Sequence, residues 1–236
     1  MAFSIRSVRD LSDIKFCKCD VEVDGGSVFL FGLDELKGLC DKFKDLLQDS
    51  ERQTANGYKD FRAKENYIIR HGLLRMILAD VTGIKAKDIR LFHGNFERPY
   101  LENAPVRKPL CFSSSSTGNL YVVAISEIAN TEIGVDIESI GTDFNFMELA
   151  CAFFHEEEIL YLERMDKEER LPGFIQVWTE KEAYLKASQD FSFKNFAVPV
   201  ISSTDQVAEK AIGGSFWHFR YLDFGPDIKS TLVYRL

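Results

Sequence analysis

The sequence predicts an α+β fold in two halves of similar size. Strand-like and helix-like stretches follow one another in mixed order along the 236 residues, which is typical of α+β architecture. Near residues 112–119 a loop rich in Pro, Asn and Arg gives way to continuous apolar runs, so we place a boundary there. We therefore expect an N-terminal half over residues 1–112 and a C-terminal half over residues 113–236.

The N-terminal half is predicted to start with strands and continue into two helices. Residues 12–31 carry short β-favouring pieces around a glycine-rich turn signal. Apolar residues over 33–47 follow the spacing of an amphipathic helix. A second helix is predicted over about 59–82, where Gly83 is a natural stop. Residues 89–92 are predicted to form a strand before the loop.

The C-terminal half is predicted to begin with two strands, continue with two helices and end in strands. Residues 120–125 form a continuous apolar run, and residues 133–138 form a second strand-like stretch; the short connection between them predicts a hairpin. Helices are expected at about 146–165 and 173–188. The alternating aromatic residues over 217–234 indicate strands at the end of the chain.

Composition argues against several classes of protein. The net charge is −8, whereas a general nucleic-acid-binding protein is normally basic. No apolar run approaches the roughly 20 residues that span a bilayer, and no secretory signal precedes the first elements. The five Cys are scattered and odd in number, and the four His are dispersed as well. These features predict a cytoplasmic protein with reduced thiols and with neither a nucleic-acid nor a membrane partner.

Two carboxylates lie two residues apart in a predicted strand. Side chains alternate across a strand, so Asp136 and Glu138 project from one face while Ile137 points to the other. Like charges on one face repel each other. A bound divalent cation would relieve that repulsion, and a solvent-facing strand surface would tolerate it. The pair by itself leaves both interpretations open.

A second charged group lies in the last predicted helix. Glu182 and Lys186 are four residues apart and therefore neighbours on one helix face, where they could form an ordinary surface pair. Lys181 falls inside the apolar arc, so its stem either lies along the core or its ammonium reaches a buried anion. Taken together with Asp136 and Glu138, this group suits a magnesium ion that bridges a diphosphate, because Mg²⁺ prefers carboxylate, water and phosphate oxygens.

These two segments resemble the paired signature of the 4′-phosphopantetheinyl transferase superfamily. The strand motif is Gly134-Val135-Asp136-Ile137-Glu138, and the helix motif is Trp178-Thr179-x-Lys181-Glu182-Ala183-x-x-Lys186. Four further segments agree with the family in order along the chain: Leu74-Arg75, Arg98-Pro99, Phe112-Ser113-Ser114-Ser115-Ser116-Thr117, and Phe153-Phe154-x-x-Glu157. Chain length resembles the surfactin-synthetase-activating type, which implies a monomer whose two similar halves form a pseudo-dimer, each half with a small mainly antiparallel sheet packed against helices.

The resemblance implies a role for each matching residue. The implied Mg²⁺ ligands are Asp136, Glu138 and Glu182. The implied catalytic set adds Lys186, which would contact the diphosphate. The implied contacts to coenzyme A are Arg70, Arg98, Ser115, Ser116, Thr117, Asp136, Lys181 and Lys186. The resemblance places Ser115–Thr117 in a loop at the nucleotide end, and by position it makes Arg70 and Arg75 candidates for the 3′-phosphate.

The resemblance also implies a reaction. A serine of an acyl or peptidyl carrier protein would attack the β-phosphorus of coenzyme A, and adenosine 3′,5′-bisphosphate would leave. The cation and Lys186 would stabilise the charge that develops. Either Glu182 or a water on the metal ion would take the proton of the serine hydroxyl, and the sequence leaves both open.

Two departures from the family pattern bear on coenzyme A binding. Ser116 stands where the family has His, so a neutral hydroxyl replaces a charged donor, and a charge-assisted hydrogen bond is roughly twice as strong as a neutral one. Arg98 stands where the family has Lys, which keeps the charge and changes the geometry. Two other functions stay open at this point. One is an impaired module that binds coenzyme A or a carrier protein, and the other is a Mg²⁺-dependent phosphodiester hydrolase.

Overall fold

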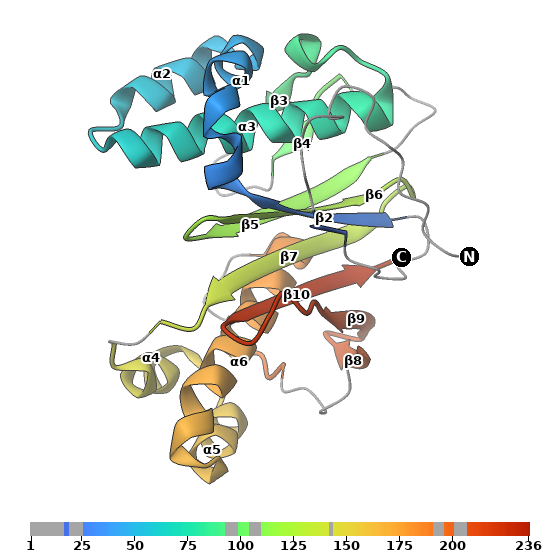
Figure 1. The fold of residues 1–236 in the computed structure, drawn as a ribbon. Coiled ribbons are helices and arrows are strands. Elements are labelled where there is room, and N and C mark those ends of the chain that lie inside the picture. The colour runs from blue at the N-terminus through green and yellow to red at the C-terminus, as the bar shows by residue number, and fades with distance from the viewer. Residues whose placement is uncertain are drawn as a thin grey trace.

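The structure is a computed structural model that describes residues 17–18, 26–92, 99–103, 110–141, 144–190, 196–200 and 207–236. Its elements form four layers, with two sheets stacked in the middle and helices covering the outer face of each (Figure 1). Helices and antiparallel sheets coexist in this arrangement, which confirms the predicted α+β class.

The first sheet and its helices come from the N-terminal part of the chain. The strand order is β1-β2-β6-β5, with every pair antiparallel. The strands are β1 (Cys17–Lys18), β2 (Gly26–Gly32), β5 (Cys111–Thr117) and β6 (Leu120–Ser126). The helical layer contains η1 (Leu33–Leu39), α1 (Cys40–Leu46), α2 (Asp49–Gly57) and α3 (Phe61–Thr82). Three small elements follow α3: η2 (Ala86–Asp88), β3 (Leu91–Phe92) and β4 (Tyr100–Leu101).

The second sheet and its helices come from the rest of the chain. The strand order is β7-β10-β9-β8, again antiparallel throughout. The strands are β7 (Glu132–Ser139), β8 (Val207–Ile212), β9 (Ser215–Tyr221) and β10 (Ile228–Arg235). The helices are α4 (Phe146–Phe153), α5 (Glu156–Arg164) and α6 (Lys167–Ser188). The chain thus passes from the first sheet to the second between Ser126 and Glu132, so β5, which spans residue 112, and β6, which follows it, belong to the same sheet as β2.

Three apolar clusters hold the layers together. One lies between the first sheet and its helices, one between the two sheets, and one between the second sheet and α4–α6. Strand β6 contributes to two of them, because Val123 faces the helices while Val122 faces the other sheet. A strand buried on both faces needs apolar residues at every position, which explains its continuous apolar run.

The predicted hairpin between the two central strands is wrong. Strand β6 pairs with β2 and β5, and β7 pairs with β10, so the two strands lie in different sheets. Both strands contribute to the cluster between the sheets, through Val122 and Ala124 of β6 and through Val135 of β7. Because each strand carries an apolar face to bury, they stack face to face instead of pairing edge to edge.

Most predicted helices are present, with corrected limits. The helix over 33–47 starts as a 3₁₀ segment, and the helix that ends before Gly83 is confirmed, with Gly83 in the left-handed region at φ 78°. The single helix predicted over 146–165 is two helices, because Phe154 is extended and His155 caps a new helix. Helix α6 starts at Lys167, six residues before the predicted start. Helix α2 and strand β4 were not predicted.

The run of serines is a strand and not a loop. Residues Ser113 to Thr117 form most of β5 and pair in register with β6. The backbone groups find their partners in that ladder, so the small polar side chains are free to bond elsewhere. This corrects the expectation of a loop at Ser115–Thr117.

Candidate active site

Strand β7 presents its two carboxylates toward helix α6. Ile137 packs in the cluster between the sheets, so the alternation of a strand sends Asp136 and Glu138 to the opposite face. Gly134 lies on that same face. A Cβ atom there would overlap the backbone of α6 at the carbonyl oxygen of Ala183. The helix and the strand therefore touch backbone to backbone, beside the two carboxylates.

Side chains from two other elements meet at Asp136. The Lys186 Nζ of α6 lies 2.6 Å from Asp136 Oδ1, and the Ser115 hydroxyl of β5 donates to the same oxygen at 2.7 Å. Lys186 also donates to Ser115 Oγ at 3.1 Å, which closes a triangle of hydrogen bonds. The other carboxylate oxygen, Asp136 Oδ2, is buried and has no hydrogen-bond partner among the described residues. A buried carboxylate oxygen without a partner is costly unless a ligand completes it.

Glu138 and Glu182 complete the charged cluster. Burial raises the pKa of Glu138, and the Asp136 carboxylate raises it further, while the Thr117 hydroxyl that donates to Glu138 Oε2 at 3.1 Å lowers it. Burial also raises the pKa of Glu182; Lys186 acts against this shift and Asp136 adds to it. Three carboxylates and one ammonium thus lie within range of one another's charge, as the sequence pattern predicted.

The cluster has the chemistry of a divalent-cation site, although its ligands are not gathered in this conformation. In the described parts of the chain, no group of three His, Cys, Asp or Glu side chains is close enough to hold a metal ion. The unpartnered Asp136 Oδ2 is nevertheless available to a cation, and carboxylate oxygens are the ligands that Mg²⁺ prefers. Glu138 and Glu182 have long, half-buried side chains that could turn toward such an ion.

Lys181 does not join this cluster. Its side chain is 1% exposed and pairs with Glu158 of α5 at 2.7 Å, and its ammonium also donates to the carbonyl oxygens of Phe196 and Val198. Burial lowers the pKa of Lys181, with Glu158 acting against the shift. All hydrogens of the ammonium are thereby committed within the C-terminal part of the chain. Of the two possibilities that the sequence left open for Lys181, the buried anion is the one observed.

The buried anion is also a different residue from the one singled out in the sequence. Glu157 is exposed, whereas Glu158 is fully buried and accepts hydrogen bonds from the backbone of His155 and Val200. His155 and Glu158 form a capping box at the start of α5. The recognised sequence signal has Ser, Thr, Asp or Asn at the cap position, so the histidine at this position hid Glu158 from the sequence.

The arginines predicted for coenzyme A fall into separate environments. Arg70 of α3 donates to the Ser116 hydroxyl, which lies on the face of β5 opposite Ser115. Arg75 is completely buried, where it pairs with Glu51 at 2.8 Å and donates to the carbonyl oxygen of Ile89 at 2.6 Å. Arg75 is therefore a structural residue, which corrects its nomination as a phosphate ligand. Arg98 lies outside the described residues.

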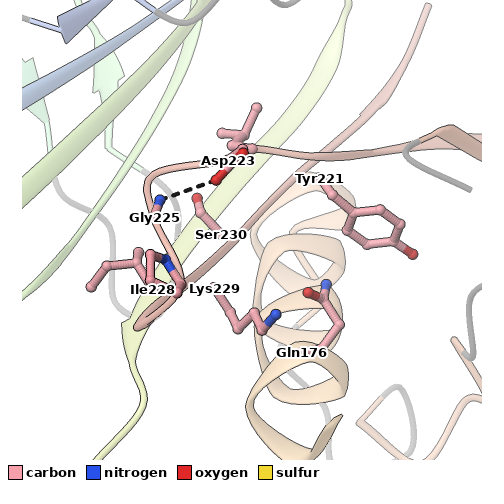
Figure 2. Close-up of a pocket in the computed structure, with 9 residues that line it drawn as sticks. Gln176, Tyr221, Asp223, Gly225, Ile228, Lys229 and Ser230 are labelled. Atoms are coloured by element: carbon pink, nitrogen blue, oxygen red, sulfur yellow. Dashed lines mark hydrogen bonds between the residues drawn. The ribbon is translucent and has the colours of Figure 1, made fainter. Parts of the chain in front are cut away.

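A pocket of about 530 Å³ lies at the turn between β9 and β10, against α6 (Figure 2). Gln176 of α6 and Lys229 of β10 face each other across it, and Gly225 donates to the Asp223 side chain in the turn. Lys229 is the direct neighbour of Glu138 in the pairing of β10 with β7. The pocket thus brings a further cation to the strand pair that carries the carboxylates, a feature that the sequence reading missed.

Comparison with known proteins shows which family the site resembles. Residues 132–230 match the 4′-phosphopantetheinyl transferase superfamily. This part of the chain is therefore similar to that superfamily. The matched segment contains all four of Asp136, Glu138, Glu182 and Lys186, whereas β5 and Arg70 lie before it.

Individual relatives of the transferase superfamily match a longer part of the chain. HetI of Nostoc sp., a 4′-phosphopantetheinyl transferase, is 27% identical over 158 residues, which cover 67% of this chain and 66% of HetI. The protein slr0495 of Synechocystis sp. is 29% identical over 146 residues, which cover 62% and 58% of the two chains. The 4′-phosphopantetheinyl transferase gsp of Aneurinibacillus migulanus is 30% identical over 115 residues, or 49% and 44%. The aligned part is thus less than two thirds of the length of each relative.

None of the described helices has both the length and the apolar character needed to cross a membrane.

Proposed function

We propose that this chain transfers the 4′-phosphopantetheine group from coenzyme A to a serine of an acyl or peptidyl carrier protein, with Mg²⁺ as cofactor and adenosine 3′,5′-bisphosphate as the second product. The observation that carries the proposal is the triangle of Asp136, Lys186 and Ser115. It joins the two parts of the family signature at one buried, unpartnered carboxylate oxygen.

The side chains of the cluster suit transfer of a group that carries a diphosphate. When bound, Mg²⁺ would neutralise charge on the diphosphate and on the departing oxygen. Lys186 is partly exposed, so its ammonium can exchange Asp136 for a phosphate oxygen without losing a charged partner. Glu182 is the candidate acceptor for the serine proton, because a raised pKa makes its carboxylate a stronger base than an exposed one.

The nucleotide end of coenzyme A would lie on the side of α3. Arg70 is the only arginine of the predicted pair that is not buried, and it already holds the Ser116 hydroxyl. We propose that a phosphate group binds between Arg70 and Ser116, with Arg98 as a further candidate. A serine at position 116 would bind more weakly than the charged His of the family.

The two halves are proposed to be related as a pseudo-dimer. Each half packs a 22-residue helix on a four-stranded antiparallel sheet, α3 in one and α6 in the other, which supports the proposal. The division into residues 1–112 and 113–236, the monomeric state and the cytoplasmic location stay predictions from the sequence.

A carrier-modification assay tests the proposed function. The protein is incubated with coenzyme A, Mg²⁺ and a panel of apo carrier proteins, and the masses of the carriers are measured by mass spectrometry. We expect one carrier to gain the mass of one phosphopantetheine and adenosine 3′,5′-bisphosphate to appear in equal amount. Release of the bisphosphate without any mass gain would indicate a hydrolase. Binding of coenzyme A with no product of either kind would indicate a binding module.

A further inference from the structure

The edge of strand β7 is closed by hydroxyl groups instead of by another backbone. Strands β5 and β7 are the edge strands of their sheets and run side by side in the same direction. The backbone N–H of Val135 donates to Ser113 Oγ at 3.1 Å, and the N–H of Ser139 donates to Thr117 Oγ1 at 3.2 Å. Ser113, Ser115 and Thr117 share one face of β5, and we call them the hydroxyl row.

Two members of the hydroxyl row direct their protons to the carboxylates of β7. A hydroxyl has a single proton to donate and two lone pairs to accept with. Ser115 donates to Asp136 and accepts from Lys186; Thr117 donates to Glu138 and accepts from Ser139. Since each proton has one destination, each hydroxyl holds one oxygen of a carboxylate in a fixed direction.

This arrangement decides which carboxylate oxygen remains available. Asp136 Oδ1 is occupied by Ser115 and Lys186, and the buried Oδ2 is the oxygen that finds no partner in the described parts of the chain. The same strand sends Ser116 to its opposite face, where the hydroxyl meets Arg70. Alternate positions of β5 therefore serve two different partners.

From this geometry we infer that Ser115 and Thr117 are positioning residues for the divalent cation and do not bind the nucleotide. They hold Asp136 and Glu138 by one oxygen each, which leaves the second oxygen of each carboxylate for the metal ion, while Ser116 on the opposite face serves coenzyme A. The inference rests on the proposed function, and it assigns Ser115 and Thr117 differently from the family resemblance. Hydrogen-bonding partners of metal ligands typically contribute 10- to 100-fold to metal affinity.

Direct binding measurements on single variants test the inference. Ser115→Ala and Thr117→Val remove one hydroxyl each at nearly constant volume, Thr117→Ser retains the hydroxyl as the matched control, and Ser116→Ala removes the hydroxyl from the other face. Binding of Mn²⁺ is followed by electron paramagnetic resonance without coenzyme A, and binding of coenzyme A is followed by calorimetry in EDTA. Far-UV circular dichroism melting confirms that each variant is folded.

We expect a crossed result, in which the two sets of variants weaken the binding of different ligands. Ser115→Ala and Thr117→Val should weaken Mn²⁺ binding by about 10- to 100-fold and leave binding of coenzyme A in EDTA unchanged, and Thr117→Ser should restore the metal affinity. Ser116→Ala should weaken coenzyme A and leave Mn²⁺ unchanged. In the transfer assay the KM for Mg²⁺ should rise for the first two variants, while the KM for coenzyme A at saturating Mg²⁺ stays constant.

Two results would overturn the inference. One is loss of coenzyme A affinity in Ser115→Ala or Thr117→Val with unchanged Mn²⁺ affinity, which would make these residues nucleotide ligands. The other is a wild-type protein that binds no Mn²⁺. Failure of the proposed function has a different signature, since the wild-type protein would then modify no carrier even where the crossed binding result holds.

Discussion

Two lysines of one helix motif have opposite environments. Lys181 is buried against Glu158 and two carbonyl oxygens, whereas Lys186 is partly exposed and holds Asp136. They are five residues apart, which is about 500° of helical rotation, or 140° apart around the axis. The spacing predicted that the two lysines lie on different faces of the helix. It did not identify the partner of Lys181, because Glu158 lies more than twenty residues earlier and its burial depends on how α5 packs.

Glu182→Gln should abolish transfer and leave the protein stable. Loss of a positioned proton acceptor typically costs 10²- to 10⁴-fold in rate. Burial disfavours the charged form of Glu182, so a neutral side chain of the same shape should change the free energy of unfolding by no more than about 1 kcal/mol. The carrier mass assay and urea denaturation give the two readouts.

The matched control for this change is Glu157→Gln, an exposed carboxylate on α5. It should change neither activity nor stability. Full transfer activity in Glu182→Gln would remove Glu182 from the site.

Replacing each lysine by Met should separate structure from activity. Lys181→Met removes the direct ion-pair partner of the buried Glu158, which typically costs about 3–5 kcal/mol. Lys186→Met removes a partly exposed partner of Asp136, so it should cost less stability and abolish transfer. Chemical denaturation midpoints and mass gain of the carrier measure both effects. Equal loss of stability in the two variants would contradict the assignment.

At the scale of elements, one buried carboxylate links the start of helix α2 to α3. Glu51 caps the start of α2 by accepting the N–H of Gln48 at 2.8 Å. The same side chain pairs with Arg75 at 2.8 Å and contacts His71 at 3.1 Å, both on α3. The sequence did not reveal α2, because this helix is short and polar and buries only Glu51 and Ala55.

Acid should weaken this attachment. Burial raises the pKa of Glu51, but the hydrogen bonds from His71 and from Gln48 and the charge of Arg75 outweigh burial, so the net pKa lies below the usual 4.5. A carboxyl with a lowered folded-state pKa contributes stability above its unfolded-state pKa and loses it as pH falls through the folded value. Urea denaturation should therefore show stability declining below about pH 4.5.

Glu51→Gln tests the origin of that decline. The variant should be less stable at neutral pH by about 3–5 kcal/mol, because Arg75 loses its buried partner, and its stability should depend less on acid. Glu35→Gln, at an exposed position, is the control. An unchanged acid profile in Glu51→Gln would assign the decline to other carboxylates.

At the scale of the whole molecule, the two sheets share a core and should unfold together. The cluster between them contains residues of β2 and β6 from one sheet and of β7 and β10 from the other, including the fully buried Leu232. Both tryptophans, Trp178 and Trp217, belong to the cluster on the other side of the second sheet. Fluorescence therefore reports on the C-terminal part of the chain, and far-UV circular dichroism reports on helices of both parts.

We expect the fluorescence and circular-dichroism transitions to coincide in urea, as they do in two-state unfolding. Leu232→Ala should lower the stability by about 2–5 kcal/mol and shift both transitions together. Two separate circular-dichroism steps, of which only one coincides with the fluorescence change, would show that the two sheets unfold independently.

The layered arrangement marks the limit of what the sequence predicted. Apolar patterns identified β6, β7, α3 and α6; for β6 the pattern was a continuous run, because both faces of this strand are buried. It did not show which strands pair, since β6 and β7 offer apolar faces that fit either a hairpin or two stacked sheets. The carboxylates and Lys186 were predicted together from spacing. The direction of the hydroxyl row depended on β5 lying against β7, which is a tertiary contact.

The missing side chain at Gly134 has a consequence for evolution as well as for packing. The distance from the helix that carries Glu182 and Lys186 to the strand that carries Asp136 is limited by the bare backbone at this one position. Even one added methyl group would push the strand and the helix apart two residues from Asp136. Mutations that add a side chain at residue 134 would therefore misalign the charged groups of the site without replacing any of them.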